Sequence, residues 1–135
     1  MKHQELIQKA LEVRQRAYAP YSHFQVGAAV WTTDDQMFLG ANVENASYGL
    51  TICAERNAIA AAISSGSTGI AILAVVSGPG ASMCGACRQV LVEFANEGTE
   101  VLLGNAAGEF EVLTVPELLP RAFDPRDLTA QKGIE

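Results

Sequence analysis

All three cysteines of this chain belong to two short segments that lie far apart in the sequence. The first segment is Cys53-Ala54-Glu55, and the second is Cys84-Gly85-Ala86-Cys87. A Cys-x-x-Cys pair can hold two thiolates on one cation at the start of a helix, and a third thiolate fills a third corner of a tetrahedron. Soft sulfur ligands favour zinc among the common intracellular metals. The pattern therefore predicts one zinc site and a fold that brings the two segments together.

The number of ligands indicates a catalytic rather than a structural metal. A structural zinc site has four protein ligands, whereas this chain has three cysteines, and its two histidines, His3 and His23, lie in other segments. Three ligands leave one position open for water, which is the arrangement of catalytic zinc. Glu55 lies two residues beyond Cys53, where a carboxylate can take a proton from that water and pass it to a substrate nitrogen.

Two arginines directly follow the predicted catalytic and metal-binding residues. Three thiolates around Zn²⁺ leave a net negative charge, which opposes the activation of water. We therefore expect Arg56 or Arg88, or both, to donate hydrogen bonds to the cysteine sulfurs and restore the electrophilicity of the metal.

Each part of the pattern has a simpler interpretation when it is taken alone. A Cys-x-x-Cys pair in an intracellular protein is also the redox motif of thioredoxin-like proteins. Cys53 alone is typical of a buried free cysteine. Glu55 alone would be a solvated carboxylate in a first helical turn, and the two arginines would be surface residues of helices. Their occurrence together favours the metal site.

Hydrophobic periodicity predicts alternating helices and strands. Helices are expected over 4–17, 52–64 and 85–96, with a short helical turn at 115–119; strands are expected over 25–32, 37–41, 70–77, 100–103 and 109–113. The continuous apolar run at 70–77 indicates a strand that is buried on both faces. This order predicts a layered sheet with helices on both faces.

The length and net charge of the chain indicate how many domains it has and which kinds of molecule it binds. The 135 residues, of 14.3 kDa, predict a single domain over 1–135 with a short C-terminal tail from about residue 128. The net charge of -6 has the wrong sign for binding a nucleic acid polymer. The N-terminus lacks the apolar region of a secretory signal, and no apolar stretch approaches the length of a membrane span. We expect a cytoplasmic protein with a small-molecule substrate and no membrane partner.

The segments around the predicted site resemble the zinc signature of the cytidine deaminases. This resemblance is carried by Cys53-Ala54-Glu55-Arg56 and Cys84-Gly85-Ala86-Cys87-Arg88-Gln89. Other segments similar to the family's occur in the same order, namely Tyr21-Ser22-His23-Phe24, Val26-Gly27-Ala28-Ala29 and Asn42-Val43-Glu44-Asn45-Ala46-Ser47-Tyr48; the resemblance covers roughly Tyr18 to Asp127. It implies an α/β fold, a three-layer sandwich with a central mixed five-stranded sheet and helices on both faces.

The resemblance also implies a reaction. It is the hydrolytic deamination of cytidine or 2′-deoxycytidine to the uridine product and ammonia, a step of pyrimidine salvage. The family's pattern assigns one Zn²⁺ per chain to Cys53, Cys84 and Cys87, and it assigns proton transfer to Glu55.

The family's substrate contacts fall on five further positions. By resemblance, Phe24 would stack on the pyrimidine, Asn42 and Glu44 would bond the ribose hydroxyls, and Ala54 would contact the substrate. Phe123 resembles a C-terminal aromatic that covers the site. Family members of this size are homotetramers in which neighbouring subunits help to complete each pocket. Taken singly, Phe24 is equally consistent with a core aromatic, and Asn42 and Glu44 with turn residues.

One departure and three rival functions stay open on the residues alone. Met83 stands directly before Cys84, where the family commonly has a proline that would stiffen the turn. The rivals are a deaminase for another aminopyrimidine, a deaminase that edits nucleic acids, and a non-catalytic zinc-stabilised oligomerisation module. The lack of a basic, aromatic-lined channel disfavours the second.

Overall fold

The computed structural model describes residues 2–128 of the chain. Its sheet has five strands, in the order β2-β1-β3-β4-β5. The strands are β1 (Gly27–Thr32), β2 (Met37–Ala41), β3 (Ile70–Val76), β4 (Ala95–Gly104) and β5 (Phe110–Thr114). The helices are α1 (Lys2–Arg14), α2 (Ala54–Ser64), α3 (Gly85–Phe94) and α4 (Val115–Leu118), with a 3-10 turn, η1, over Tyr48–Leu50.

The sheet is mixed because one connection crosses over. β3 and β4 pair in parallel, and all other neighbouring strands pair in antiparallel fashion. A parallel pair needs a long connection, and α3 supplies it between these two strands. β3 lies at the centre of the sheet, as its continuous apolar sequence predicted. The expected mixed five-stranded sheet is confirmed.

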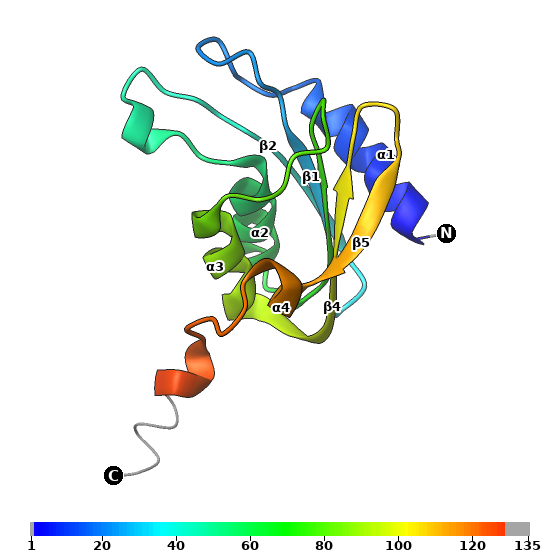
Figure 1. The fold of residues 1–135 in the computed structure, drawn as a ribbon, viewed down its shortest axis with the longest axis vertical. Coiled ribbons are helices and arrows are strands. Elements are labelled where there is room, and N and C mark those ends of the chain that lie inside the picture. Colours follow the sequence, from blue (N-terminus) through cyan, green and yellow to red (C-terminus); the bar gives the residue numbers. More distant parts are fainter. Residues whose placement is uncertain (1, 129–135) are drawn as a thin grey trace.

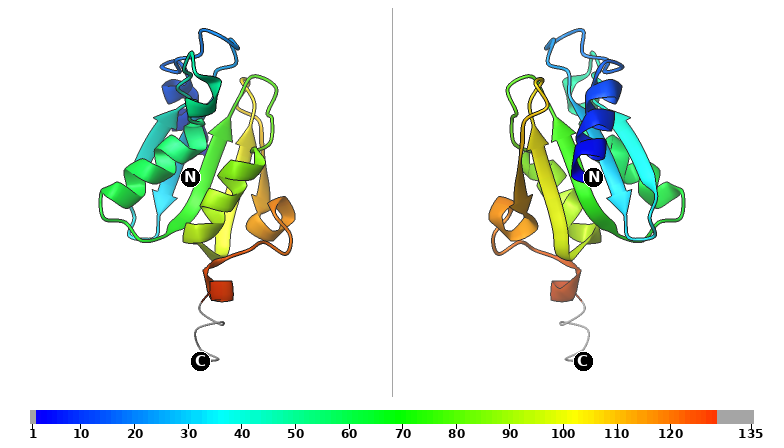
Figure 2. Two further views of the ribbon diagram at one scale, coloured as in Figure 1. Left: turned by 90° about the vertical axis from the view of Figure 1, so that its left-hand side faces the viewer. Right: turned by 90° about the vertical axis from the view of Figure 1, so that its right-hand side faces the viewer.

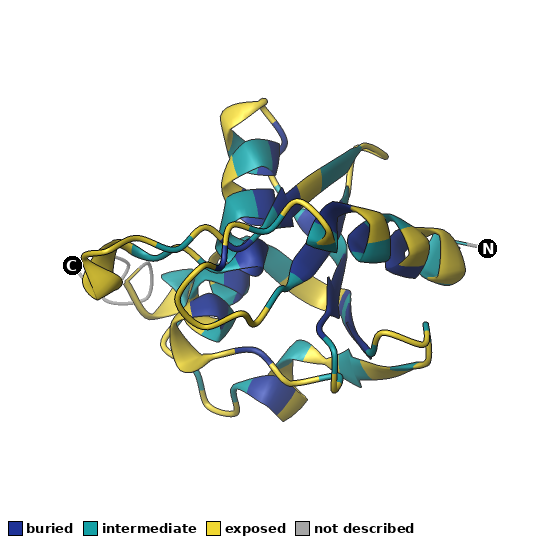
Figure 3. Ribbon diagram, turned by 90° about the horizontal axis from the view of Figure 1, so that it is seen from above, coloured by how far each residue is buried: buried dark blue, intermediate teal, exposed yellow. Residues whose placement is uncertain are grey.

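Helices cover both faces of this sheet. α1 lies on one face, while α2, α3 and α4 lie on the other (Figures 1 and 2). Neighbouring residues of β1 alternate between the two layers: Ala29 packs in the α1 cluster with Leu6, whereas Val30 packs in the α2 and α3 cluster with Ala58. Buried residues accordingly line the inner sides of the layers (Figure 3). The predicted three-layer sandwich is confirmed.

Several boundaries differ from the predicted ones by a few residues. α1 ends at Arg14 rather than at residue 17, because the next three amide groups bond three residues back in tighter turns. α2 begins at Ala54 rather than 52, because Ile52 exchanges two backbone hydrogen bonds with Val43. β4 begins at Ala95, five residues before the predicted start at 100, and its early part is irregular opposite β3.

Two further expectations concern the ends and the surface of the chain. The tail predicted from about residue 128 falls on residues 129–135, which lie outside the described part of the chain. Residues 125–128 form a helical turn. None of the helices within residues 2–128 combines the length and the apolar character that a membrane crossing requires.

The contact between α1 and β1 predicts a severe effect for Gly27→Ala. A Cβ at Gly27 would lie 2.0 Å from the carbonyl oxygen of Ala10 and 2.7 Å from the amide nitrogen of Arg14. These are backbone atoms, so α1 would have to move away from the sheet. We therefore expect the free energy of unfolding to fall by about 3 kcal/mol or more. Urea unfolding at fixed protein and zinc concentration measures it. Gly98→Ala is the control, because its Cβ would meet only the Asn96 side chain at 3.4 Å; equal losses in both variants would contradict the prediction.

Candidate functional site

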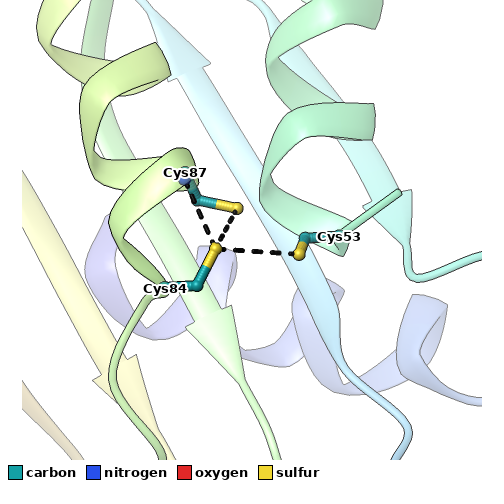
Figure 4. A group of neighbouring side chains, drawn as sticks. All are labelled: Cys53, Cys84 and Cys87. Atoms are coloured by element: carbon teal, nitrogen blue, oxygen red, sulfur yellow. Dashed lines mark hydrogen bonds between the residues drawn. The ribbon is translucent and has the colours of Figure 1, made fainter. Parts of the chain in front are cut away.

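The three predicted metal ligands meet where two helices begin. Cys53 is the N-cap residue of α2, Cys84 is the N-cap residue of α3, and Cys87 lies in the first turn of α3. The Cys84 Sγ atom lies 3.9 Å from that of Cys53 and 3.3 Å from that of Cys87, and all three sulfurs lie within 4.8 Å of one another (Figure 4). Sulfurs on a tetrahedral zinc ion are about 3.8 Å apart, as Zn–S bonds of about 2.3 Å require. The cluster therefore fits one zinc ion.

The surroundings of the sulfurs also fit a cation. A hydrogen bond from Cys87 lowers the pKa of Cys53 to about 5, with help from Arg56. The same hydrogen bond raises the pKa of Cys87. Without a cation, one sulfur therefore carries the negative charge while its neighbour keeps a proton. A dication between the three sulfurs removes this competition, because it favours the thiolate form of each ligand.

The two predicted arginine partners have different roles in the structure. Arg56 directs Nη2 towards the sulfur of Cys53 at 3.8 Å, and its buried Nε has no hydrogen-bond partner. Arg88 donates instead to oxygens: Nε to the carbonyl of Met83 and Nη2 to Ser82 Oγ, both at 2.8 Å, and Nη1 to the carbonyl of Leu118. The sulfur contact expected of one or both arginines is therefore found at Arg56, and the printed bonds of Arg88 all go elsewhere.

Arg88 also holds the backbone of Met83, the residue that differs from the family pattern. The Met83 side chain is buried, and its carbonyl accepts the Arg88 bond. Ser77 holds the earlier part of the same loop, since its Oγ accepts the amides of Gly80 and Ala81 at 3.1 and 2.8 Å. Side-chain hydrogen bonds thus restrain the turn that a proline would stiffen.

Glu55 lies beside the sulfurs in the first turn of α2 and is only 5% exposed. Burial is the main reason that the pKa of this carboxyl is raised to about 7, and the negative charge of Cys53 contributes to the same rise. A carboxyl that gains and loses a proton near neutral pH suits general acid and base catalysis.

A cavity of about 280 Å³ opens onto Glu55 and the sulfurs. This is close to the lower limit of about 300 Å³ for small-molecule sites. Its lining comes from the loop before β1, the loop before α2 with the first residues of α2, the end of β3 and the loop before α3. The lining residues are Ser22, Phe24, Val26, Asn42, Glu44, Thr51, Cys53, Ala54, Glu55, Val75, Ser77, Ala81, Ser82 and Cys84. The predicted substrate-binding residues Phe24, Asn42, Glu44 and Ala54 are all among them.

Two of these residues fasten the loop that carries Phe24. Asn42 is buried; its Oδ1 accepts the Val26 amide at 2.9 Å, and its Nδ2 donates to the Phe24 carbonyl at 2.8 Å. Glu44 accepts the amides of Tyr21 and Ser22 at 2.9 and 3.1 Å. An amide and a carboxylate keep further acceptor and donor positions when these bonds are made. Phe24 itself is 42% exposed, so it is not a core aromatic in this chain.

Sequence reasoning missed Ser22 as a residue that shapes the cavity. Its hydroxyl accepts the Phe24 amide at 3.0 Å and donates to Glu44 Oε2, so it joins two predicted substrate contacts. The hydroxyl bond holds the pKa of Glu44 below its ordinary value. A serine two residues before an aromatic is a local turn signal, because serine hydroxyls accept amides two positions ahead.

Phe123 lies outside the lining of this cavity. It is 60% exposed, and its carbonyl accepts a bond from Gln89 Nε2 at 2.7 Å. The segment after α4 runs to the opposite end of the molecule from the loops before β1 and α2 (Figure 1). Within one chain, the predicted cover of the site is therefore not in place.

Comparisons with known proteins agree with this site. Residues 1–103 match the family described as the cytidine and deoxycytidylate deaminase zinc-binding region. The chain is 48% identical to a cytidine deaminase of Halalkalibacterium halodurans, over 95% of this chain and 98% of the relative, and 46% identical to one of Sporosarcina psychrophila, over 93% and 94%. The crystal structure of cytidine deaminase from Burkholderia pseudomallei superposes with a TM-score of 0.86 at 47% identity, over 91% of this chain and all of that one. The family match and the sulfur cluster confirm the predicted zinc cofactor.

The different contacts of the two arginines predict different effects on zinc. Arg56→Met should raise the dissociation constant for zinc by roughly 10- to 100-fold, because it removes the donor to one sulfur of the predicted zinc site. Arg88→Met should change it much less and lower Tm instead, because three oxygens lose their donor. Competition with a chromogenic chelator measures the first quantity and thermal unfolding the second. Unchanged zinc affinity in Arg56→Met would refute the role of this donor.

Proposed function

Because the chain belongs to the cytidine and deoxycytidylate deaminase family, we propose that it is an enzyme that hydrolyses cytidine to uridine and ammonia. The observation that carries this proposal is the position of Glu55. This buried carboxyl lies beside three converging sulfurs and faces a cavity of nucleoside scale. We extend the proposal to 2′-deoxycytidine as a second substrate.

Glu55 is proposed to move the protons of the reaction. A zinc ion held by Cys53, Cys84 and Cys87 would supply a Lewis acid that lowers the pKa of a water molecule. Glu55 takes the proton from the attacking water and delivers it to N3 of the pyrimidine, which makes C4 electrophilic. The water oxygen then bonds to C4. Glu55 then carries a second proton from the new C4 hydroxyl to the amino group, so that the C4–N bond breaks, ammonia leaves and the C4 carbonyl of uridine forms.

The opposite wall of the cavity is proposed to hold the substrate. Phe24 presents an aromatic face on which a pyrimidine can stack. Asn42 and Glu44 offer the donors and acceptors that ribose hydroxyls need, and Ala54 contacts the base beside Glu55. Ser22 keeps Phe24 and Glu44 in place through its hydroxyl. The acidic surface and the lack of a cationic residue in this lining disfavour a nucleic acid polymer as substrate.

We further propose a cytoplasmic homotetramer, each chain a single deaminase domain, acting in pyrimidine salvage. Support comes from the exposed apolar side chains of one chain, which include Tyr48 and Leu50 of η1 and Phe123. Large apolar side chains that are exposed on one chain would be buried by contacts between subunits. In the tetramer, Phe123 of one subunit would cover the cavity of a neighbour.

The first experiment measures uridine and ammonia release from cytidine together with zinc content in one sample. We expect turnover with about one zinc per chain. Zinc without turnover on cytidine or deoxycytidine would refute the proposal and favour another aminopyrimidine or a structural metal. A sample that lacks zinc is reconstituted with it before the assay.

Glu55→Gln separates proton transfer from metal binding. Glutamine keeps the shape of the side chain but cannot carry the proton, so we expect at least about a 10²- to 10⁴-fold loss of kcat at unchanged zinc content. Glu12→Gln removes one exposed carboxylate of α1, on the far face of the sheet, and should leave kcat as it is. Residual activity near the wild-type level in Glu55→Gln would contradict the proton-transfer role.

Mixed oligomers test the proposed position of Phe123. Phe123→Ala should raise KM for cytidine about tenfold, the effect of losing roughly 1.4 kcal/mol, while the solution mass stays near four times 14.3 kDa. Mixing this variant with Glu55→Gln should lower KM part of the way back to the wild-type value, because the inactive chains bring an intact Phe123 to active neighbours. A KM that does not change on mixing, or a monomeric mass, would contradict this arrangement.

A further inference from the structure

Two of the three sulfurs are closer to one another than zinc coordination requires. Cys84 and Cys87 lie three residues apart on the first turn of α3, where side chains are neighbours. Their sulfurs are 3.3 Å apart, against 3.9 Å between Cys84 and Cys53, which sits on another helix (Figure 4). A disulfide bond of about 2.05 Å would need the pair to close by about 1.3 Å, within a single helical turn.

The two sulfurs of this pair also differ in access. Cys84 is exposed and lines the cavity, whereas Cys87 is buried behind it. An oxidant that enters the cavity therefore meets Cys84 first. The sulfur of Cys87 lies close to that of Cys84, so it can react with the sulfenic acid that oxidation would form on Cys84. An accessible thiolate beside a second thiol is the arrangement of cysteines that oxidise reversibly.

We propose that Cys84 and Cys87 form a site of reversible oxidation by hydrogen peroxide, in which an intramolecular disulfide replaces their bonds to zinc and releases the metal. This inference rests on the zinc ligation in the proposed function. The two interpretations of the Cys-x-x-Cys motif, metal ligand and redox pair, then describe two states of the same residues.

The chemistry balances with peroxide as the only oxidant. The Cys84 thiolate attacks one peroxide oxygen, the O–O bond breaks, and hydroxide leaves as Cys84 becomes a sulfenic acid. The Cys87 thiolate attacks the sulfenic sulfur, the S–S bond forms, and a second hydroxide leaves. The two sulfurs lose two electrons in total, and the two hydroxides take up two protons to become water. A dithiol reductant reverses the oxidation by exchange.

Loss of zinc follows from the number of ligands. After the disulfide forms, Cys53 is the one thiolate left of the three, which is too few for a tetrahedral site. Because both oxidised residues lie on α3, the bond does not need to pull α2 towards α3. The fold can therefore persist without the metal and accept zinc again after reduction.

The arginines of the chain make a direct test possible. Trypsin cleaves after Arg16, Arg56 and Arg88, and no lysine or arginine lies between these positions, so Cys53 falls in peptide 17–56 and both Cys84 and Cys87 fall in peptide 57–88. Zinc-loaded protein is treated with hydrogen peroxide, released zinc is followed with a chromogenic chelator, and free thiols are alkylated before digestion.

We expect the loss of two thiols and one zinc per chain. Peptide 57–88 should be two hydrogens lighter and free of alkylation, and peptide 17–56 should be alkylated once. Dithiothreitol with added zinc should restore three thiols and the metal. Protein stripped of zinc should form the same disulfide, and Cys87→Ser should form none within peptide 57–88.

Three results would overturn the proposal. They are a cross-link between peptides 17–56 and 57–88, addition of oxygen to Cys84 or Cys87 rather than to Met83 without a disulfide, and zinc release with all three thiols intact. Glu55→Gln protein is the matched control, because it should oxidise like the wild type although it does not turn over. If zinc and thiols behave as expected but no deamination is found, the proposed function fails and the oxidation site stands.

Discussion

The sulfur cluster depends on one geometric constraint, the convergence of two helix N-termini at the end of the central strand. β3 runs into the loop before α3, and α3 returns the chain to β4 in parallel with β3. α2 packs beside α3 on the same face of the sheet and starts at the same end (Figure 2). Cap positions at both starts then place sulfurs, free amides and the positive ends of two helix dipoles around one point. The parallel crossover is therefore what makes a three-cysteine site possible in this small sheet.

The two arginines near the sulfur cluster contact different groups: one contacts a sulfur, and the other contacts the loop before α3. Arg56 acts on a sulfur, and its buried Nε has no hydrogen-bond partner among the described residues. Arg88 acts on the backbone that leads to Cys84, and it ties this loop to the end of α4. The two arginines thus differ in function: Arg56, on α2, reaches a sulfur, whereas Arg88, on α3, reaches oxygens of the loop before α3 and of α4. Burial raises the pKa of Glu55 to about 7, so a carboxyl that can gain and lose a proton near neutral pH lies close to the sulfurs.

The sequence was sufficient for the order of the elements, the layers and the residues that form the cluster. Periodicity identified β3 because its apolar run is continuous, and the cysteines were recognisable because their spacing is rare. The start of β4 at Ala95 was not predicted, since Gly98 and the polar residues around it are typical of a loop, and Thr99 holds them to β3 through a buried bond to the Ile70 carbonyl. The roles of Ser22 and Ser77 were not predicted because hydroxyl bonds to nearby amides leave no periodic signal.

The short backbone pairings beside η1 connect the two sides of the cavity. Val43 pairs with Tyr18 on one side and with Ile52 on the other, and Ile52 directly precedes Cys53. Backbone hydrogen bonds therefore connect the segment that leads to Phe24 with the start of α2, where Cys53 lies. Substitutions that move the loop carrying Phe24 would therefore also act on the position of Cys53 through Val43 and Ile52. Selectivity and reactivity in this protein would then change together during evolution, because the same backbone pairings join the parts that provide them.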